Sequence, residues 1–229
     1  MSRAKPANRK EPAAPPQASV WTKDEERFLN RLSGPFEIQA FLDRIPYDDV
    51  PGTRSPRWVI RERRANCFEG ALFAAAALRR LGHRPLIVDM YAVNDDDHIL
   101  AVFRRRGLWG AIAKSNMTTL RFREPVYRTP RELAMSYFDV YFNTLGDKTL
   151  RSYARPLDLS RFDRRGWMTT SDDIGSIGDV LNGMKHTPLL APGAARSLHR
   201  VGPLLFRAGM LDAKLSGLYR AKERAARRS

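Results

Sequence analysis

The chain has 229 residues, a formal net charge of +15 and an apolar share of 43%. This size and composition suit one globular domain with a real core and appended segments. They argue against a membrane-spanning protein, because no stretch reaches the roughly 18 apolar residues that a span needs. Residues 1–20 also lack the apolar run of a secretory signal. We therefore expect a cytoplasmic protein without a transmembrane segment, and the single cysteine agrees with a reducing compartment.

The basic excess is spread along the whole chain. Residues 1–20 carry +3, residues 219–229 carry +4, and residues 21–218 carry the remaining +8. An Arg-rich, solvated surface is enough to explain this charge. The alternative interpretation is that the charge weakly attracts an anionic partner. The sequence contains no RNP, KH, zinc-finger, P-loop or dinucleotide-binding pattern.

The N-terminal part of the chain is predicted to be an arm followed by short helices. Residues 1–20 hold too few apolar groups to offset the entropy of ordering, so we expect a disordered basic arm. Thr22 and Glu25 form a capping-box pattern, and Pro35 and Pro56 stand where helices start. These signals predict helices over residues 22–32, 36–44 and 56–63.

Cys67 is the only cysteine and opens an apolar, Ala-rich run that ends near Leu81, with Gly82 as a suitable C′ residue. A helix that is apolar all round is a buried helix. Its first turn carries unpaired N–H groups and the positive end of the helix dipole, which stabilise a thiolate and lower the pKa of its thiol. The two interpretations are inert core packing and nucleophilic chemistry.

Three strands are predicted next, over residues 85–93, 98–103 and 108–113, with turns at 94–97 and 104–107. His98 lies at the mouth of the second hairpin. If that turn centres between Arg106 and Gly107, position 98 opposes Ser115; if it centres on Gly107, position 98 opposes Asn116. Either side chain can accept a hydrogen bond from an imidazole N–H. A thiol, a base and a group that orients the base are what acyl-transfer chemistry needs.

The remaining elements are predicted more weakly. Thr129 and Glu132 form a second capping-box pattern, which predicts a helix through Phe142 whose aromatic residues pack in the core. Strands are expected over 120–122 and over 150–159, the latter broken at Pro156, and a weak helix after Ser171. Two helical stretches are expected over 194–210 and 211–228, the last amphipathic and basic. His83 is expected to face solvent in the loop between helix and strand, and His186 and His199 are expected to be isolated.

The stretch 58–116 resembles the core of the transglutaminase-like superfamily, as a bacterial-type member with a papain-like thiol fold. The family pattern is roughly G-x-C-x-[DE]-x-A, followed by a helix that ends in L-G-x-x-[AP]. The matching residues are Cys67, Glu69, Ala71, Leu81, Gly82 and Pro85, and His98 follows the cysteine by 31 residues. The resemblance implies an α+β fold in which the Cys67 helix packs on an antiparallel sheet, with extra N- and C-terminal helices. It implies a domain over residues 21–160 and a C-terminal extension with a basic tail over 161–229.

The sequence also departs from the family pattern. Ala65 replaces a frequent Gly, Leu100 replaces a frequent Trp, and no Asp stands at the usual position after Trp109. The expected catalytic residues are therefore Cys67, His98 and Asn116, with Ser115 as the alternative orienter. The Cys67 N–H would bind the oxyanion, with Asn66 or Trp58 as a second donor.

Together these residues predict thiol-dependent acyl transfer or amide hydrolysis on a peptide or another amide or acyl substrate, without a cofactor. The alternative is a catalytically degenerate binding protein that uses its basic surface for an anionic partner. Asp95, Asp96 and Asp97 beside His98 would suit a divalent ion, but consecutive residues cannot all face one ion from a strand. We therefore expect no metal.

Overall fold

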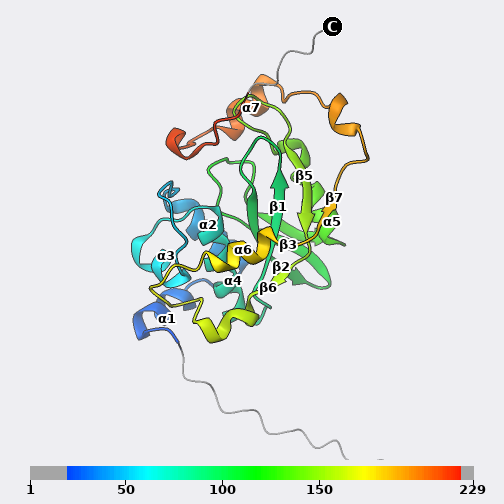
Figure 1. Cartoon of the computed structure of the whole chain (residues 1–229). Helices are drawn as coiled ribbons and strands as arrows, with labels where there is room; N and C mark the ends of the chain where they lie inside the picture. Colours follow the sequence, from blue (N-terminus) through cyan, green and yellow to red (C-terminus); the bar gives the residue numbers. More distant parts are fainter. Residues whose placement is uncertain (1–19, 223–229) are drawn as a thin grey trace, which may run out of the picture.

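The computed structural model describes residues 20–222, so nearly all of the predicted N-terminal arm and the end of the basic tail lie outside it. The described chain is an α+β protein with a seven-stranded antiparallel sheet (Figure 1). Its strands follow the order β4-β3-β2-β1-β5-β7, and β6 pairs with β1. No helix within this range is long and apolar enough to cross a membrane.

The strands are β1 (Leu86–Ala92), β2 (His98–Arg105), β3 (Leu108–Ile112), β4 (Arg123–Tyr127), β5 (Leu150–Ala154), β6 (Leu157–Asp158) and β7 (His186–Pro188). The α-helices are α1 (Lys23–Asn30), α2 (Pro35–Arg44), α3 (Pro56–Glu62), α4 (Cys67–Arg80), α5 (Pro130–Met135), α6 (Ser176–Asn182) and α7 (Pro203–Gly209). The 3-10 turns are η1 (Phe138–Val140), η2 (Leu159–Arg165), η3 (Ala194–Ser197) and η4 (Leu215–Gly217).

The N-terminal helices and the Cys67 helix begin where their sequence signals place them. Thr22 caps α1 through a complete capping box with Glu25, and Pro35 and Pro56 occupy the first turns of α2 and α3. Helix α4 is buried along most of its length, as its apolar composition predicts. Gly82 follows it with a φ of 85°, a conformation that glycine adopts without strain.

Two core clusters lie on the two faces of the sheet. Strand β2 alternates between them, as a pleated strand must. The residues that pack with α4 are Ile99, Ala101 and Phe103. The residues that pack with the aromatic segment after α5 are Leu100 and Val102. His98 is an even-numbered residue of β2 like Leu100 and Val102, so its side chain lies on the same face of the sheet as theirs.

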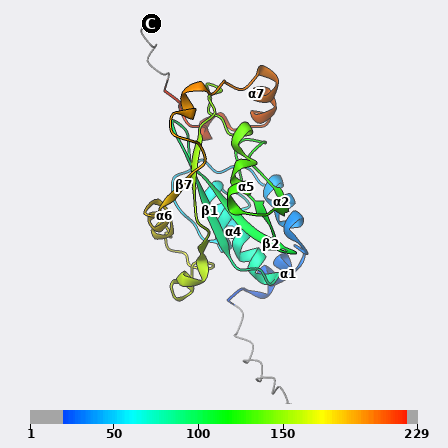
Figure 2. The same cartoon turned by 90° about the vertical axis from the view of Figure 1, so that its right-hand side faces the viewer.

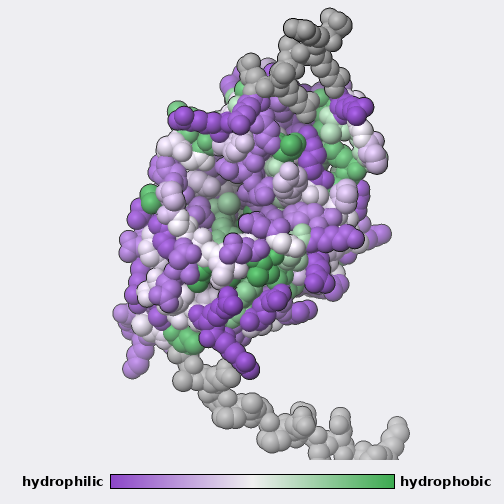
Figure 3. Space-filling model, in the orientation of Figure 1, coloured by the Kyte–Doolittle hydropathy of each residue, from purple (hydrophilic) through white to green (hydrophobic). Residues whose placement is uncertain are grey.

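Figure 2 shows α1 and α2 along one side of the molecule and α6 along the other. The face seen in Figure 3 is mostly hydrophilic, with hydrophobic residues in separate patches.

The β2–β3 hairpin resolves the choice of register. Arg105 pairs with Leu108, and the two turn residues, Arg106 and Gly107, have φ values of 52° and 84°. Positive φ at both positions is the mark of a type I′ turn, whose twist suits a two-residue hairpin. The pairing runs as far as Ala101 with Ile112. Continued by three residues, this register would place Ser115 rather than Asn116 opposite position 98.

Four predicted elements are wrong in whole or in part. Residues 120–122 form no strand, and β4 begins at Arg123 instead. The helix opened by Thr129 stops at Met135 and continues only as the turn η1, although its aromatic residues are buried as expected. In the described part of 194–228, the only α-helix is α7, and residues 211–222 are not α-helical. Gly202, Pro203 and Gly209 interrupt the helical periodicity there. The side-chain contacts described below hold the segment in its place.

Gly70 allows α4 to approach the segment after β3 closely. A Cβ on this residue would overlap the Cβ of Lys114, whose ammonium donates to the carbonyls of Leu42 and Ile45. We therefore expect Gly70→Ala to destabilise the protein by about 1–3 kcal/mol, because the buried lysine has little freedom to move. Thermal unfolding should show a lower midpoint. Gly183→Ala is the matched control, since its Cβ would meet only ordinary contacts; equal midpoints for the two variants would contradict the packing argument.

Candidate active site

Cys67 is the first residue of α4, and a capping box fixes the start of that helix. The Asn66 side chain accepts from the Glu69 N–H at 2.9 Å, and the Glu69 carboxylate accepts from the Asn66 N–H at 3.2 Å. This exchange satisfies backbone donors that a helix start leaves unpaired. It also shows why Glu69 stands two residues after the cysteine: its carboxylate holds the turn that carries the thiol.

Arg54 ties this helix start to the preceding loop. Its Nε lies 2.6 Å from Glu69 Oε1, and its Nη2 lies 2.6 Å from Asp48 Oδ2. Both carboxylates are buried. The guanidinium stacks on the Trp58 ring at 3.9 Å. Trp58 therefore supports Arg54 and is not among the residues that line the space around Cys67, where we expected a possible oxyanion donor.

Cys67, His98, Ser115 and Asn116 all line one cavity, so the structure brings the predicted triad candidates together. The cavity has a volume of about 50 Å³. That space holds a few water molecules but no amino-acid residue of a substrate. Further lining comes from Tyr47, Asp95, Asp96, Asp97, Met117, Leu120, Tyr141 and Gly217 to Tyr219.

The sulfur and the imidazole reach this cavity from different sides. The Cys67 thiol lies 3.9 Å from the Asp97 carbonyl. The main-chain N–H groups of Phe68 and Ile99 and the Tyr47 hydroxyl act to lower the pKa of the thiol. The His98 side chain follows the alternation of the opposite core, where its Nε2 lies 2.8 Å from the Leu120 carbonyl. Within residues 20–222 no hydrogen bond joins Cys67 to His98.

The two predicted orienters use their side chains elsewhere. Asn116 donates to the Lys214 carbonyl and accepts from the Lys214 N–H, both at 2.8 Å. The Ser115 hydroxyl accepts from the Met117 N–H at 3.0 Å. The hydrogen-bond partner of His98 is the Leu120 carbonyl. Because a carbonyl only accepts, His98 must carry its proton on Nε2, which leaves Nδ1 as the basic nitrogen.

In this closed arrangement the thiol and the imidazole are both neutral near pH 7. Burial raises the pKa of Cys67 to about 11, and the nearby Asp96 charge adds to the rise. Burial lowers the pKa of His98 to about 4. The expectation of a lowered thiol pKa is therefore wrong for this state, because burial and the Asp96 charge outweigh the neighbouring N–H and hydroxyl groups that lower it.

The acidic turn beside the thiol is held by neutral groups. The Tyr141 hydroxyl donates to the Asp96 carbonyl at 2.6 Å, and the Thr149 hydroxyl donates to Asp95 Oδ2 at 2.7 Å. Asp97 accepts from the Ala92 N–H at 2.8 Å. Burial raises the pKa of Asp95 to about 6. The described part of the chain contains no group of three or more acidic, His or Cys side chains arranged to hold a metal ion.

The expectation that His186 is isolated is wrong. Its Nε2 lies 3.3 Å from Asp89 Oδ2, and its Nδ1 lies 3.3 Å from the Ser152 hydroxyl. The other carboxylate oxygen of Asp89 is buried without a hydrogen-bond partner. Burial, with a contribution from the Asp97 charge, raises the pKa of Asp89 to about 7.

The Asp89 carboxyl is expected to make folding depend on pH. Between about pH 4 and pH 7 the folded protein holds a proton that the unfolded chain releases, because the folded pKa lies above the usual value of 3.8. This stabilisation is complete below the unfolded pKa and is lost as the pH rises through 7. Asp89→Asn cannot titrate, so its unfolding free energy relative to the wild type should rise by up to about 1.4 kcal/mol per pH unit across this window.

Urea unfolding at pH 4, 5.5, 7 and 8 would measure that difference, with the exposed Asp179→Asn as the control variant. A difference between Asp89→Asn and the wild type that stays constant over this range would refute the assigned ionisation.

Sequence reasoning missed two parts of the cavity. Tyr47 lies in a loop without periodicity, and nothing in the sequence links it to the cysteine twenty positions later. A parallel bridge between Tyr47 and Ala65 puts it there. The second part is the segment from Gly217 to Tyr219, which we expected to be helical. Its position depends on tertiary contacts alone.

No family model and no curated protein matches this chain. The likeness to the transglutaminase-like superfamily therefore rests on the sequence motif around Cys67.

Proposed function

We propose that Cys67 is the nucleophile of a thiol-dependent acyl transfer or amide hydrolysis, in a site similar to that of the transglutaminase-like superfamily. The observation that carries the proposal is the shared cavity. A lone cysteine at a capped helix N-terminus and a buried histidine on the adjacent strand line the same small cavity. A thiol and a base in one water-restricted site are the minimum that this chemistry needs.

The residues take the following roles. His98 accepts the thiol proton on Nδ1, and the Cys67 sulfur forms a bond to the substrate carbonyl carbon. The Cys67 N–H, with Asn66 beside it, binds the oxygen that becomes negative. The bond from carbon to the leaving nitrogen then breaks, and His98 returns the proton to that nitrogen. Water or a second nucleophile attacks the thioester and releases the thiol.

The closed cavity opposes the first proton transfer, because the imidazole is a weak base and the thiol a weak acid there. Admission of water or a polar substrate reduces the burial that causes both shifts. The proposed activity therefore belongs to an opened form of the site.

The second candidate function is a non-catalytic binding protein with the same cleft. The raised thiol pKa and the engagement of Asn116 with Lys214 favour it. The charge of +15 would then serve an anionic partner through the surface.

Acylation by a small activated ester separates the two candidates. We expect p-nitrophenyl acetate to place an acetyl group on Cys67 of folded Gly217→Val protein, in which the added side chain is meant to open the cavity, faster than on the same chain unfolded in urea. Intact-protein mass spectrometry with peptide mapping would follow the adduct, and Cys67→Ser should form none at this position. Folded Gly217→Val protein that reacts no faster than its unfolded chain would contradict the proposal and favour the binding protein.

A further inference from the structure

Residues 214–222, here called the strap, cross the Cys67 cavity and are held at both ends by asparagine side chains. Asn116 donates to the Lys214 carbonyl and accepts from the Lys214 N–H, at 2.8 Å each. Asn94 makes the same pair of bonds with Lys222, at 2.8 Å and 2.9 Å. Each carboxamide thus pairs with both main-chain groups of one strap residue. This kind of contact recognises a polypeptide chain irrespective of its side chain at that position.

The middle of the strap closes the cavity. Gly217, Leu218 and Tyr219 line it together with Cys67. A Cβ on Gly217 would lie 3.1 Å from the Tyr47 ring and 3.2 Å from Asn116 Nδ2. These distances are shorter than ordinary contacts, so Tyr47 or the strap would have to shift by a few tenths of an ångström to admit a Cβ, and the two further methyl groups of valine add to that displacement. In Figure 1 this segment is the red ribbon that follows α7, at the end of the molecule opposite α1.

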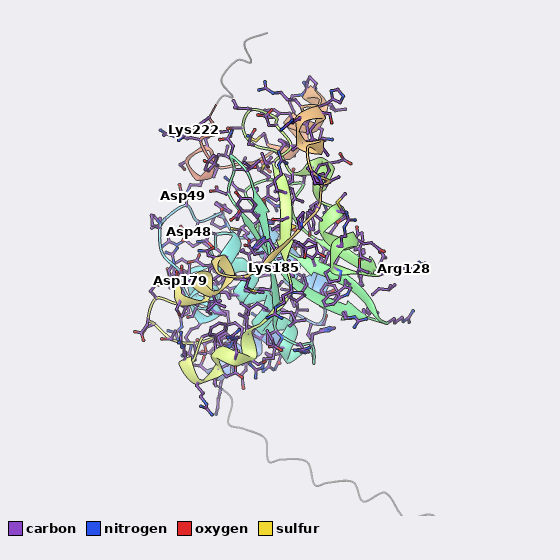
Figure 4. All side chains as sticks on the ribbon, turned by 45° about the vertical axis from the view of Figure 1, so that its right-hand side comes forward. Asp48, Asp49, Arg128, Asp179, Lys185 and Lys222 are labelled. Carbon is purple, nitrogen blue, oxygen red and sulfur yellow. The ribbon has the colours of Figure 1, made fainter. Side chains whose placement is uncertain are left out.

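The surface under the strap is acidic, although the protein as a whole is strongly basic. Lys214 Nζ lies 2.5 Å from Asp49 Oδ1, and hydrogen bonds from Lys214 and Ser216 lower the pKa of Asp49 to about 2. Asp96 and Asp97 line the adjoining cleft. Asp48 lines it too, but its buried carboxylate is already paired with Arg54. Figure 4 shows Asp48, Asp49 and Lys222 along the same edge of the molecule. Such a surface attracts a basic chain.

The strap is attached weakly enough to leave. Its bonds are mostly polar and at the surface, and Leu215, a large apolar residue of the strap, is 79% exposed. Gln39 makes the same pair of bonds with the main chain of Ala113, but those bonds lie in the buried interior, whereas the bonds to the strap lie at or near the surface. Segments with little apolar burial and exposed hydrogen bonds open at low free energy.

From these contacts we infer that the Cys67 cleft is a binding groove for a basic polypeptide segment, recognised through its main chain, and that the strap is its tethered occupant. The bound chain has a glycine over Tyr47 and a lysine beside Asp49. The inference deepens the proposed function, since a chain bound there presents its carbonyl groups to Cys67. A tethered occupant competes at an effective concentration of about millimolar, so a free peptide binds well only after the strap has left.

Peptide binding to variants of the strap tests whether the cleft binds a polypeptide, and a protein without the Cys67 thiol keeps this test independent of any reaction. The probe is a fluorescein-labelled synthetic peptide with the sequence of residues 212–222, and the protein carries Cys67→Ser throughout. Gly217→Val should expel the strap but leave the groove intact, so the peptide should bind this protein at least about tenfold tighter than Cys67→Ser alone. Adding Asn94→Gly, which removes one carboxamide and suits the positive φ of 55° at this position, should weaken that binding again.

Gly202→Val is the matched control, because a Cβ there meets open space and lies outside the strap. Lys214→Pro is an independent strap variant, since the φ of −74° at Lys214 suits proline while the N–H that binds Asn116 is lost. Hydrogen exchange at residues 214–222 should accelerate in both strap variants. Unchanged exchange in both, or faster exchange without tighter peptide binding, would overturn the inference.

The two proposals can fail separately. If the peptide binds to Gly217→Val protein but p-nitrophenyl acetate does not acylate Cys67 selectively, the groove stands and the catalytic role falls. If Cys67 is acylated selectively but no peptide binds, the catalytic role stands and the groove falls.

Discussion

Replacing Arg54 with methionine is expected to destabilise the folded protein by about 3–5 kcal/mol near pH 8, because the buried Glu69 carboxylate loses its cation and Asp48 keeps only the more distant Arg64, at 3.9 Å. Glu69 is completely buried and Asp48 nearly so, and Arg54 contacts both at 2.6 Å. Methionine keeps an apolar stem against Trp58 but removes the charge. The cost should be smaller at pH 5, since a buried carboxyl without its cation takes up a proton more readily.

Thermal and urea unfolding would measure this loss, with Arg84→Met as the control. Arg84 also pairs with a carboxylate, Asp158, but the arginine side chain is 74% exposed, so its removal should change stability by less than about 1 kcal/mol. Similar losses for both variants would mean that Arg54 is an ordinary surface ion pair. Reduced acylation of Cys67 in folded Arg54→Met protein would further show that the pair positions the helix start.

In Gly217→Val protein, replacing His98 with alanine is expected to slow acylation of Cys67 by a factor of about 100 to 10,000, the usual contribution of a positioned general base. His98 is the buried imidazole that lines the Cys67 cavity. Alanine also removes the hydrogen bond to the Leu120 carbonyl, so stability falls as well. His98→Gln separates the loss of the base from the loss of stability, because its amide can donate to the Leu120 carbonyl but cannot take up a proton near neutral pH.

Stopped-flow measurement of p-nitrophenol release would give these rates. In the same Gly217→Val background, His98→Gln should fold normally and still acylate slowly, and the exposed His199→Ala should react at the rate of Gly217→Val alone. A rate in folded His98→Gln protein equal to that of Gly217→Val alone would show that the base lies elsewhere.

Local signals predicted the helical half of the fold and the hairpin well. Capping residues, proline positions and apolar periodicity are properties of neighbouring residues, so they place α1 to α4 and β1 to β3 correctly. The Arg106–Gly107 turn is a similar case: two residues with positive φ fix the register, and the sequence had reduced the alternatives to two. The α+β class and the buried Cys67 helix follow from these elements.

The parts that failed depend on distant contacts. The basic, amphipathic pattern of the C-terminal segment favoured a helix, but carboxamides on residues 94 and 116 hold its main chain instead. The same contact engages Asn116, so the orienter predicted from strand pairing has a different partner. The thiol pKa was predicted from the helix dipole alone, whereas burial and the charge of Asp96 raise it. Residue spacing along the chain does not predict such tertiary contacts, nor the burial and nearby charge that set the thiol pKa.

The central claim is that Cys67 becomes a reactive thiolate beside His98 once the strap has left the cavity. The most direct test is the pH dependence of Cys67 alkylation by iodoacetamide in Gly217→Val protein, with and without His98→Ala. The account predicts an apparent pKa below the usual cysteine value of about 8.5 in Gly217→Val protein, and a higher value when His98 is also removed. The closed wild-type protein should stay above the usual value. A Gly217→Val protein that titrates at or above about 8.5, or whose apparent pKa is unchanged by His98→Ala, would contradict the claim.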